Sequence, residues 1–381
     1  MIDVEAGEVE GRRWTPARLA KWAYLAATAV GVLMRFQLAG VPIPGRFDHL
    51  LHAHSHTLYF GWGALGLLAA AGVGRVGSGW AALLAGLLLI PLGVGFLVVG
   101  YAPITIGIST ILMIVWYVVA WRWWKHTAPT SAAGLAIRGG IAYLVGSTIG
   151  IWFLAVAQAL DLGRIAEQLG VHGFLSGFGW FFVMGVTGVV LTDPSRFGLA
   201  VDVERARRVL MGWMALGWLV FPLAVPGGMS VPVLGWLARS AGVLLVVPTL
   251  VWAQLLWCHV QSGPFRAIIR WSAAWLTIGV SALGAVAIGG DDVLAMAGRQ
   301  GVVVHLHALF VGYVTPLLAL ALASTPTRAL LVHHLALAAM LGGLTLVMGG
   351  VVSLGMWVAA VAAGGLWLAA SRWGSSIGRV R

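Results

Sequence analysis

The chain has 381 residues, of which 60% are hydrophobic and only 9% are charged, and its formal net charge is +11. A soluble domain carries about 25% charged residues, so the composition excludes an ordinary soluble protein and predicts an all-α integral membrane protein. The single cysteine, Cys258, excludes a disulfide framework and a cysteine metal cluster. The cations occur singly between apolar runs, which argues for a lipid bilayer and against nucleic acid as the partner.

Apolar windows of about 20 residues predict twelve transmembrane helices joined by short connections. In chain order we expect them at 17–39, 48–73, 78–100, 103–124, 135–159, 168–191, 206–226, 231–257, 268–289, 301–323, 328–350 and 353–371. A membrane domain over 17–371 therefore lies between an N-terminal tail, 1–16, and a C-terminal tail, 372–381. The N-terminal tail has no apolar core, so no cleavable signal peptide is expected.

Lysine and arginine are distributed unequally between the two sides that this helix count defines. With a cytoplasmic N-terminus, 18 of the 23 cations fall inside, and Arg35, Arg46, Arg164 and Arg299 fall outside, while Arg239 lies within a helix. An excess of cations in cytoplasmic loops is the usual orientation signal of membrane proteins. We therefore expect both termini in the cytoplasm, with the protein in the cytoplasmic membrane of a bacterium or archaeon.

A nine-residue pattern occurs three times, at 54–62, 172–180 and 305–313. In each copy a histidine is followed six to eight residues later by an apolar residue, a glycine and an aromatic residue. The copies fall on the second, sixth and tenth predicted helices, which all run from the outside to the inside. This spacing predicts three pseudo-symmetric blocks of four helices, with the histidines at a similar depth in the outer half of the membrane.

Six histidines near the outer ends of these helices are candidate ligands: His52, His54, His56, His172, His305 and His307. An imidazole is costly in hydrocarbon unless it is paired or ligating, so their recurrence at one depth predicts haem or metal binding. Residues two apart on a helix point about 200° apart, so the two histidines of the tenth helix should serve different sites. A bis-histidine haem takes one imidazole from each of two facing helices, and imidazole also suits copper.

Other residues in these helices are expected to have structural roles. Gly61, Gly179 and Gly312 are small residues of the kind that let helices approach closely. His333 and His334 start the eleventh helix on the inner side, so we expect them to be interfacial and tens of ångströms from the candidate ligands. No carboxylate or lysine falls at mid-membrane depth, so proton pumping is not predicted.

The helix count, the three blocks and the histidines on helices 2, 6 and 10 resemble subunit I of the haem-copper oxidase superfamily. The stretch 54–62 looks most like short subunit I-like relatives and the NnrS family of haem- and copper-containing membrane proteins. The resemblance implies that His307 and one of the three histidines of helix 2 ligate a low-spin haem. It also implies that His305 ligates a high-spin haem and that His172 is a copper ligand.

One departure from the oxidases concerns copper. Their two adjacent histidines on helix 7 have no counterpart here, because 206–226 contains no histidine. The candidate metal ligands are therefore the histidines of the three patterns, in which helix 2 would replace the missing pair: His54, His56, His172, His305 and His307. The expected cofactors are one or two haems, with copper as the second candidate.

The predicted function is that of a haem or haem-copper membrane protein for electron transfer or for chemistry on a diatomic gas such as NO or O2. As an oxidoreductase it would resemble a nitric oxide reductase or an oxidase, and it would need a cytochrome or quinol donor or partner subunits. One alternative is an NnrS-like protein of the nitric oxide response without terminal oxidase activity. Another is a copper-handling membrane transporter, although the three patterns run in one direction, unlike inverted transporter repeats.

Overall fold

The computed structural model describes residues 15–72, 79–263, 265–322 and 327–374, and over them it is almost entirely helical. No strand occurs in this part of the chain, where the one β-bridge joins Leu199 to Val260. Ten of the described helices are long and apolar enough to cross a membrane. The prediction of an all-α membrane protein in a lipid bilayer is therefore confirmed. The predicted tails, 1–16 and 372–381, lie largely outside the described residues.

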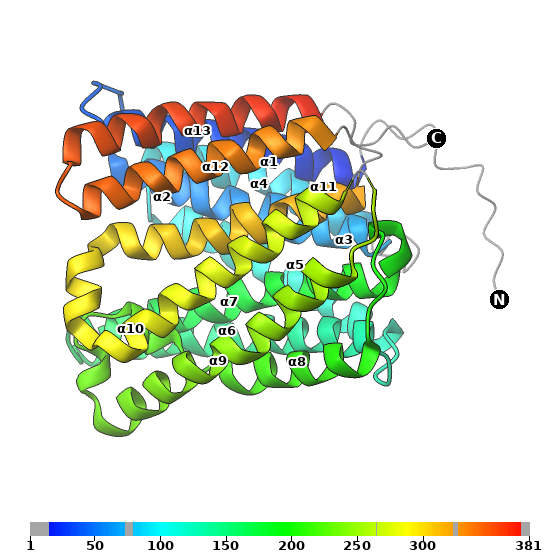
Figure 1. Ribbon diagram of the computed structural model, residues 1–381. Helices are drawn as coiled ribbons and strands as arrows, with labels where there is room; N and C mark the ends of the chain where they lie inside the picture. Colours follow the sequence, from blue (N-terminus) through cyan, green and yellow to red (C-terminus); the bar gives the residue numbers. More distant parts are fainter. Residues whose placement is uncertain (1–14, 73–78, 264, 323–326, 375–381) are drawn as a thin grey trace.

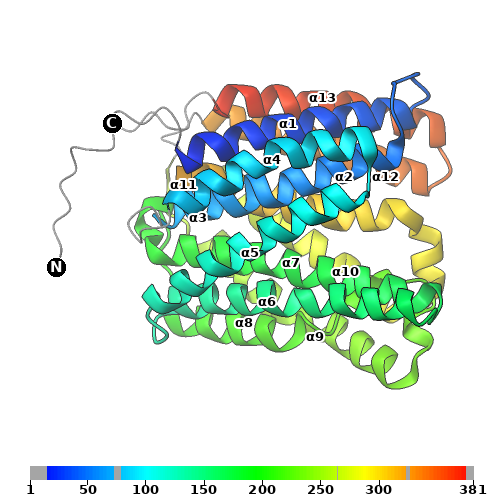
Figure 2. The same ribbon diagram turned by 180° about the vertical axis from the view of Figure 1, so that it is seen from behind.

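The helices lie side by side in one bundle, with α12 and α13 on the face shown in Figure 1 and α1, α4, α5 and α6 on the face shown in Figure 2. In chain order they are α1 (Pro16–Leu38), α2 (Phe47–His56), η1 (Thr57–Leu65), α3 (Gly66–Ala70), α4 (Gly79–Val99), α5 (Pro103–His126), α6 (Ala132–Ala159), α7 (Arg164–Thr192), η3 (Pro194–Phe197), α8 (Val203–Leu216), η4 (Phe221–Ala224), η5 (Gly228–Ser230), α9 (Pro232–His259), α10 (Arg266–His307), η6 (Ala308–Val314), α11 (Thr315–Leu322), α12 (Thr327–Met348) and α13 (Val352–Gly374). The start of α1 and the end of α13 lie at the same end of the bundle, as an even number of crossings requires (Figure 1).

Several helices begin where the sequence supplies an N-terminal cap. The Thr15 side chain accepts a hydrogen bond from the Arg18 amide, and proline occupies the first turn of α1. Ser131 caps α6 in the same way by accepting from the Gly134 amide at 2.9 Å. Such caps satisfy backbone N–H groups that have no partner inside the helix, so they fix where a helix starts.

The second and seventh predicted helices are not among the ten spans. Residues 47–70 are divided into α2, η1 and α3, although the backbone stays in the right-handed helical region at both junctions. The helix expected at 206–226 ends at Leu216 and is followed by the short 3-10 turns η4 and η5. Pro222 and the Pro-Gly-Gly run that starts at Pro226 explain this early end, because proline removes a helical hydrogen bond and glycine favours turns.

The predicted connection between the ninth and tenth helices, 290–300, is itself helical and belongs to α10. Gly290 has a φ of +67°, a left-handed conformation that glycine adopts without strain and that interrupts the regular helix. The two parts of α10 therefore form separate membrane spans, and the second part, 300–307, continues through η6 into α11.

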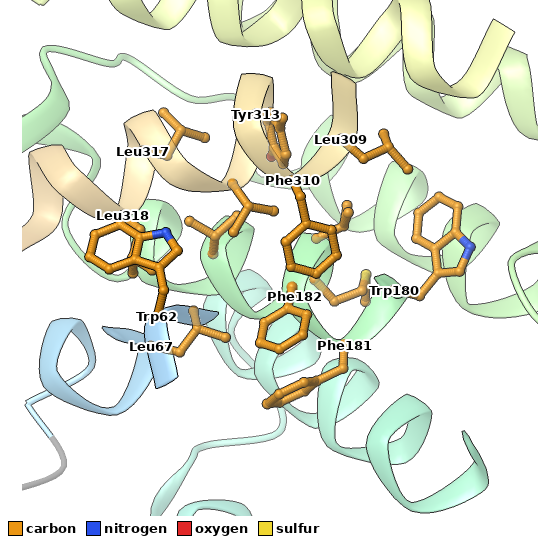
Figure 3. Close-up of a cluster of buried hydrophobic side chains, with 14 of the residues drawn as sticks. Trp62, Leu67, Trp180, Phe181, Phe182, Leu309, Phe310, Tyr313, Leu317 and Leu318 are labelled. Carbon is orange, nitrogen blue, oxygen red and sulfur yellow. The ribbon is translucent and has the colours of Figure 1, made fainter. Parts of the chain in front are cut away.

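Aromatic side chains fill the contact between η1, α7 and η6 (Figure 3). The Phe310 ring lies with its centroid 4.9 Å from those of both Tyr59 and Phe182. The Trp62 indole N–H donates to the Thr315 hydroxyl at 3.0 Å, which joins η1 to α11. This layer fixes the relative depth of the three helices that carry the repeated pattern.

Candidate functional site

The histidine pairs of the second and tenth predicted helices have the same local structure. His54 and His56 end α2, and the π-helical segment η1 begins at the next residue. His305 and His307 end α10, and the π-helical segment η6 begins at the next residue. Single π-helical turns inside α-helices are frequent at functional sites, so this junction marks both pairs independently of the sequence pattern.

The first histidine of each pair is held by a backbone carbonyl of the preceding membrane span. His54 Nδ1 lies 2.7 Å from the Ala27 carbonyl oxygen on α1, and His305 Nδ1 lies 2.7 Å from the Gly279 carbonyl oxygen in α10. A carbonyl oxygen only accepts, so Nδ1 carries the proton in both neutral rings and Nε2 keeps its lone pair. A carbonyl that fixes this tautomer is a usual outer partner of a metal-ligating histidine.

The second histidine of each pair donates to its own helix. His56 Nδ1 lies 3.0 Å from the His52 carbonyl oxygen, and His307 Nδ1 lies 2.8 Å from the Val303 carbonyl oxygen. His56 Nε2 already accepts a hydrogen bond from the Tyr101 hydroxyl at 3.3 Å. His307 Nε2 makes no such bond within the described part of the chain, so its lone pair is available to a ligand.

The three histidines of helix 2 divide between two faces. His52 and His56 pack on the side of α4, where the His52 and Tyr101 ring centroids are 4.4 Å apart. His54 lies on the side of α1, where a Cβ added to Gly31 would come within 2.9 Å of its ring. His54 also interacts electrostatically with His307. Of the three histidines, His54 is therefore the one whose ring faces α1.

Arg35, which the charge distribution marks only as an outside cation, lies one turn beyond Gly31, the residue that the His54 ring contacts. It lies on α1, its side chain is only 9% exposed, and it interacts electrostatically with both His54 and His307. No ion pair or side-chain hydrogen bond joins it to another of the described residues. The signal in the sequence is a single arginine in the last turns of an otherwise apolar span.

All six candidate histidines are half-buried, whereas 60–68 and 308–321, further along the same helices, are fully buried. The bundle is therefore less tightly closed at the level of the histidines than at the level of the aromatic layer. The candidate histidines therefore lie at the more exposed end of helices whose continuation is tightly packed.

The glycines of the three patterns differ in their contacts. A Cβ added to Gly61 would overlap that of Ala23, and one added to Gly312 would overlap that of Trp275. These two glycines are close-approach residues, as predicted. Gly179 has no atom within 4 Å of such a Cβ, so the packing role predicted for it is wrong.

His172 in α7 also differs from the other candidates. Its ring makes no hydrogen bond among the described residues, whereas the first histidines of the other two patterns both donate to a carbonyl. The fold therefore orients His54 and His305 alike, and it does not give His172 the same support. Its role as a copper ligand stays a prediction.

His333 and His334 are fully buried, so the prediction of an interfacial position is wrong. His333 Nε2 lies 2.9 Å from the Val311 carbonyl oxygen, and the Trp275 indole N–H donates to His334 Nδ1 at 3.2 Å. Val311 is one turn beyond His307, a rise of about 6 Å, so the pair is not tens of ångströms from the candidate ligands. Both residues fall inside the predicted span 328–350, which was the available signal.

The Val311 carbonyl is free to bind His333 because of the π-helical register of η6. The Thr315 amide donates to the Phe310 carbonyl, five residues earlier. In the same register the Val311 carbonyl would pair with residue 316, which is proline and has no N–H. His333 supplies the missing donor, so it has a structural role in holding α12 against η6.

Comparison with known proteins does not assign a family. No protein-family model matches the chain, and no curated protein sequence matches it. The function proposed below therefore rests on the tautomers of His54 and His307, their mutual position and the buried Arg35.

Proposed function

We propose that the chain is a membrane haem protein with the fold of the haem-copper oxidase subunit I superfamily, and that His54 and His307 would hold a low-spin haem. The observation that carries this proposal is the shared state of the two rings. They come from different helices, and each has Nδ1 satisfied by a carbonyl, which leaves Nε2 with its lone pair. Haem iron takes the lone pair of neutral imidazole, which is the group that this arrangement leaves available on both rings.

The residues around the two rings fit a haem. Gly31 leaves space for the His54 ring on α1, and the histidines are less closely packed than the layer beneath them. Arg35 is a buried cation beside both rings, and a haem carries carboxylates. When bound, a haem of this type supplies one-electron redox chemistry. The chain's own contribution is to hold the two imidazoles and select their tautomers.

A repeated helix-pair geometry supports three four-helix blocks. The residue that binds the first histidine is Ala27 for His54 and Gly279 for His305, each on the preceding helix. In both copies the pattern glycine lies seven residues after the histidine. It contacts the residue four positions before the one whose carbonyl binds the histidine, which is Ala23 for Gly61 and Trp275 for Gly312. Two of the three proposed blocks thus repeat the same helix contact in the same register.

Aromatic pairs extend this register to the third block. Tyr24 packs on Trp62 with ring centroids 4.8 Å apart, and Tyr143 stacks on Trp180 at 6.1 Å. Tyr24 and Tyr143 are 119 residues apart, and the two tryptophans are 118 apart. Trp275 contacts Gly312, the glycine of the last pattern. The interval from Tyr24 to Trp275 equals the interval between the first and the last pattern.

Twelve membrane crossings follow from this proposal, with both termini cytoplasmic. The ten spans are joined by 47–70, which is about 36 Å long as a helix, and by α8 with the turns that follow it. Reporter fusions to the two termini test the orientation. Both are expected to report the cytoplasm, and an external terminus would contradict the count.

The decisive experiment is a visible absorption spectrum of the purified protein, with iron and copper analysis. We expect at least one iron per chain and the bands of a six-coordinate low-spin haem in the reduced state. A protein that contains copper but no haem would support the copper-handling transporter instead. A protein with neither would overturn haem and copper binding together.

A second site at His305 is expected if the protein acts on a diatomic gas. His305 has the same tautomer as His54, and it points away from His307 because the two are two residues apart. Replacing His305 by alanine should leave the low-spin spectrum in place and remove any five-coordinate signal that responds to carbon monoxide. Carbon monoxide difference spectra measure this. An unchanged carbon monoxide signal in the variant would mean that the gas binds elsewhere, and the absence of such a signal from the wild-type protein would leave electron transfer as the function.

A further inference from the structure

The side of α2 that packs toward α4 carries two imidazoles that the proposed haem does not use. His52 and His56 are one helical turn apart, and residues four apart lie on the same face of a helix. Their ring centroids are 6.2 Å apart. Two histidines at this spacing can reach a single metal ion, as they do in helical zinc motifs.

The ring nitrogens of this pair are in the state that metal binding requires. The His56 Nδ1–H donates to the His52 carbonyl oxygen at 3.0 Å, so Nε2 keeps its lone pair. That lone pair accepts only a long hydrogen bond, of 3.3 Å, from the Tyr101 hydroxyl. The His52 ring makes no hydrogen bond to any of the described residues. A metal ion therefore has to displace only one weak contact, the one at His56.

The pair is enclosed on one side and open on the other. Phe96 is fully buried, and its ring centroid lies 4.3 Å from that of His56. Tyr101 is 58% exposed, and its ring centroid lies 4.4 Å from that of His52. In the described part of the chain no third histidine, cysteine or carboxylate completes a metal-binding group. Two protein ligands, with water in the remaining positions, make a site at which the metal ion can exchange.

We propose that His52 and His56 bind a divalent transition-metal ion near the end of the bundle where α2 begins. Imidazole suits copper and zinc, and a nitrogen site of this kind takes Cu²⁺ more tightly than Zn²⁺. Both rings bind as neutral imidazoles, so neither has to give up a proton at neutral pH. His54 is two residues from each of them and points about 200° away, toward α1, so this site is separate from the proposed haem.

The first test is calorimetric titration of the purified protein with Zn²⁺, in the wild type and in His52→Ala and His56→Ala. Each substitution leaves one imidazole, which cannot chelate, so the affinity for Zn²⁺ should fall at least tenfold. The double variant should bind no more than a few-fold more weakly than either single variant, because the two rings act as one unit.

His259→Ala is the matched control for this titration. His259 Nδ1 lies 3.2 Å from the Leu255 carbonyl oxygen on its own helix, so the ring is held in the same way as that of His56. No second histidine lies one turn before or after it in the sequence. Its replacement should leave the affinity for Zn²⁺ unchanged.

The second test counts the ligands directly. Electron paramagnetic resonance of the protein with one equivalent of added Cu²⁺ should show two imidazole nitrogens in the wild type. It should show only one in His52→Ala and in His56→Ala. Thermal unfolding without added metal identifies any variant that has failed to fold, and the other single variant then carries the comparison.

Two outcomes would overturn the inference. One is a wild-type affinity for Zn²⁺ in both single variants, and the other is an equal loss in His259→Ala, which would indicate unspecific binding to exposed histidines. Neither outcome bears on the haem. A protein without haem that still binds Zn²⁺ through this pair would refute the proposed function and leave the present inference standing.

Discussion

Alanine at position 307 is expected to abolish the six-coordinate low-spin haem spectrum, and alanine at position 54 is expected to do the same. Each substitution removes one of the two imidazoles whose Nε2 lone pairs are free and whose rings interact. An axial ligand cannot be replaced by a neighbouring side chain held at another angle, so the loss should be almost complete. Absorption spectra of the purified variants, normalised to protein, measure it.

The matched controls are His52→Ala and His56→Ala on the same helix. His56 is engaged with Tyr101, and His52 packs on the same side, away from α1. Both control variants should keep the low-spin spectrum. Loss of that spectrum in His56→Ala but not in His54→Ala would mean that the helix 2 ligand has been assigned to the wrong face.

Alanine in place of Gly61 or Gly312 should destabilise the protein by about 1–3 kcal/mol each, because the added methyl group overlaps a neighbouring helix. The added methyl group would meet the Cβ atom of Ala23 or of Trp275. A Cβ atom is bonded directly to the backbone, so it cannot move aside by a change of rotamer. The helices can relieve the overlap only by separating. Thermal unfolding of the detergent-solubilised variants, followed by circular dichroism, measures the effect.

Gly179→Ala provides the control for these two variants. It makes the same change at the same position of the repeated pattern, but there the added Cβ has no neighbour within 4 Å. Its unfolding midpoint should match that of the wild-type protein or exceed it, since alanine favours helices over glycine. Equal destabilisation by all three substitutions would contradict the prediction, because helix propensity favours alanine and Gly179 has no close neighbour to explain a loss.

Composition and apolar length were sufficient to predict the membrane fold and most helix boundaries. The prediction for α1, 17–39, differs by only a residue at each end from the observed helix, whose start is fixed by the Thr15 cap and Pro16. The seventh helix was predicted too long, since a hydropathy window counts Pro222 and its neighbours as apolar and does not register the hydrogen bonds that they remove.

The repeated pattern led to the candidate histidines, but it could not say which way each ring faces. Only the fold shows that His54 lies on the side of α1 while His56 contacts Tyr101. Arg35 was counted as a topology signal, because charge statistics do not reveal burial. His333 was misplaced for a related reason: its partner is a carbonyl freed by Pro316, and no sequence window records backbone hydrogen bonding.

The π-helical segments have a consequence for how the three patterns are compared. In an α-helix a step of seven residues returns to nearly the same direction, so His172 and Gly179 point to one side of α7. A π-helix turns less per residue, so the equal step in η1 and η6 brings the histidine and the glycine to different angles. Identical spacing in the sequence therefore encodes different directions of the histidine and the glycine in α7 from those in the other two patterns.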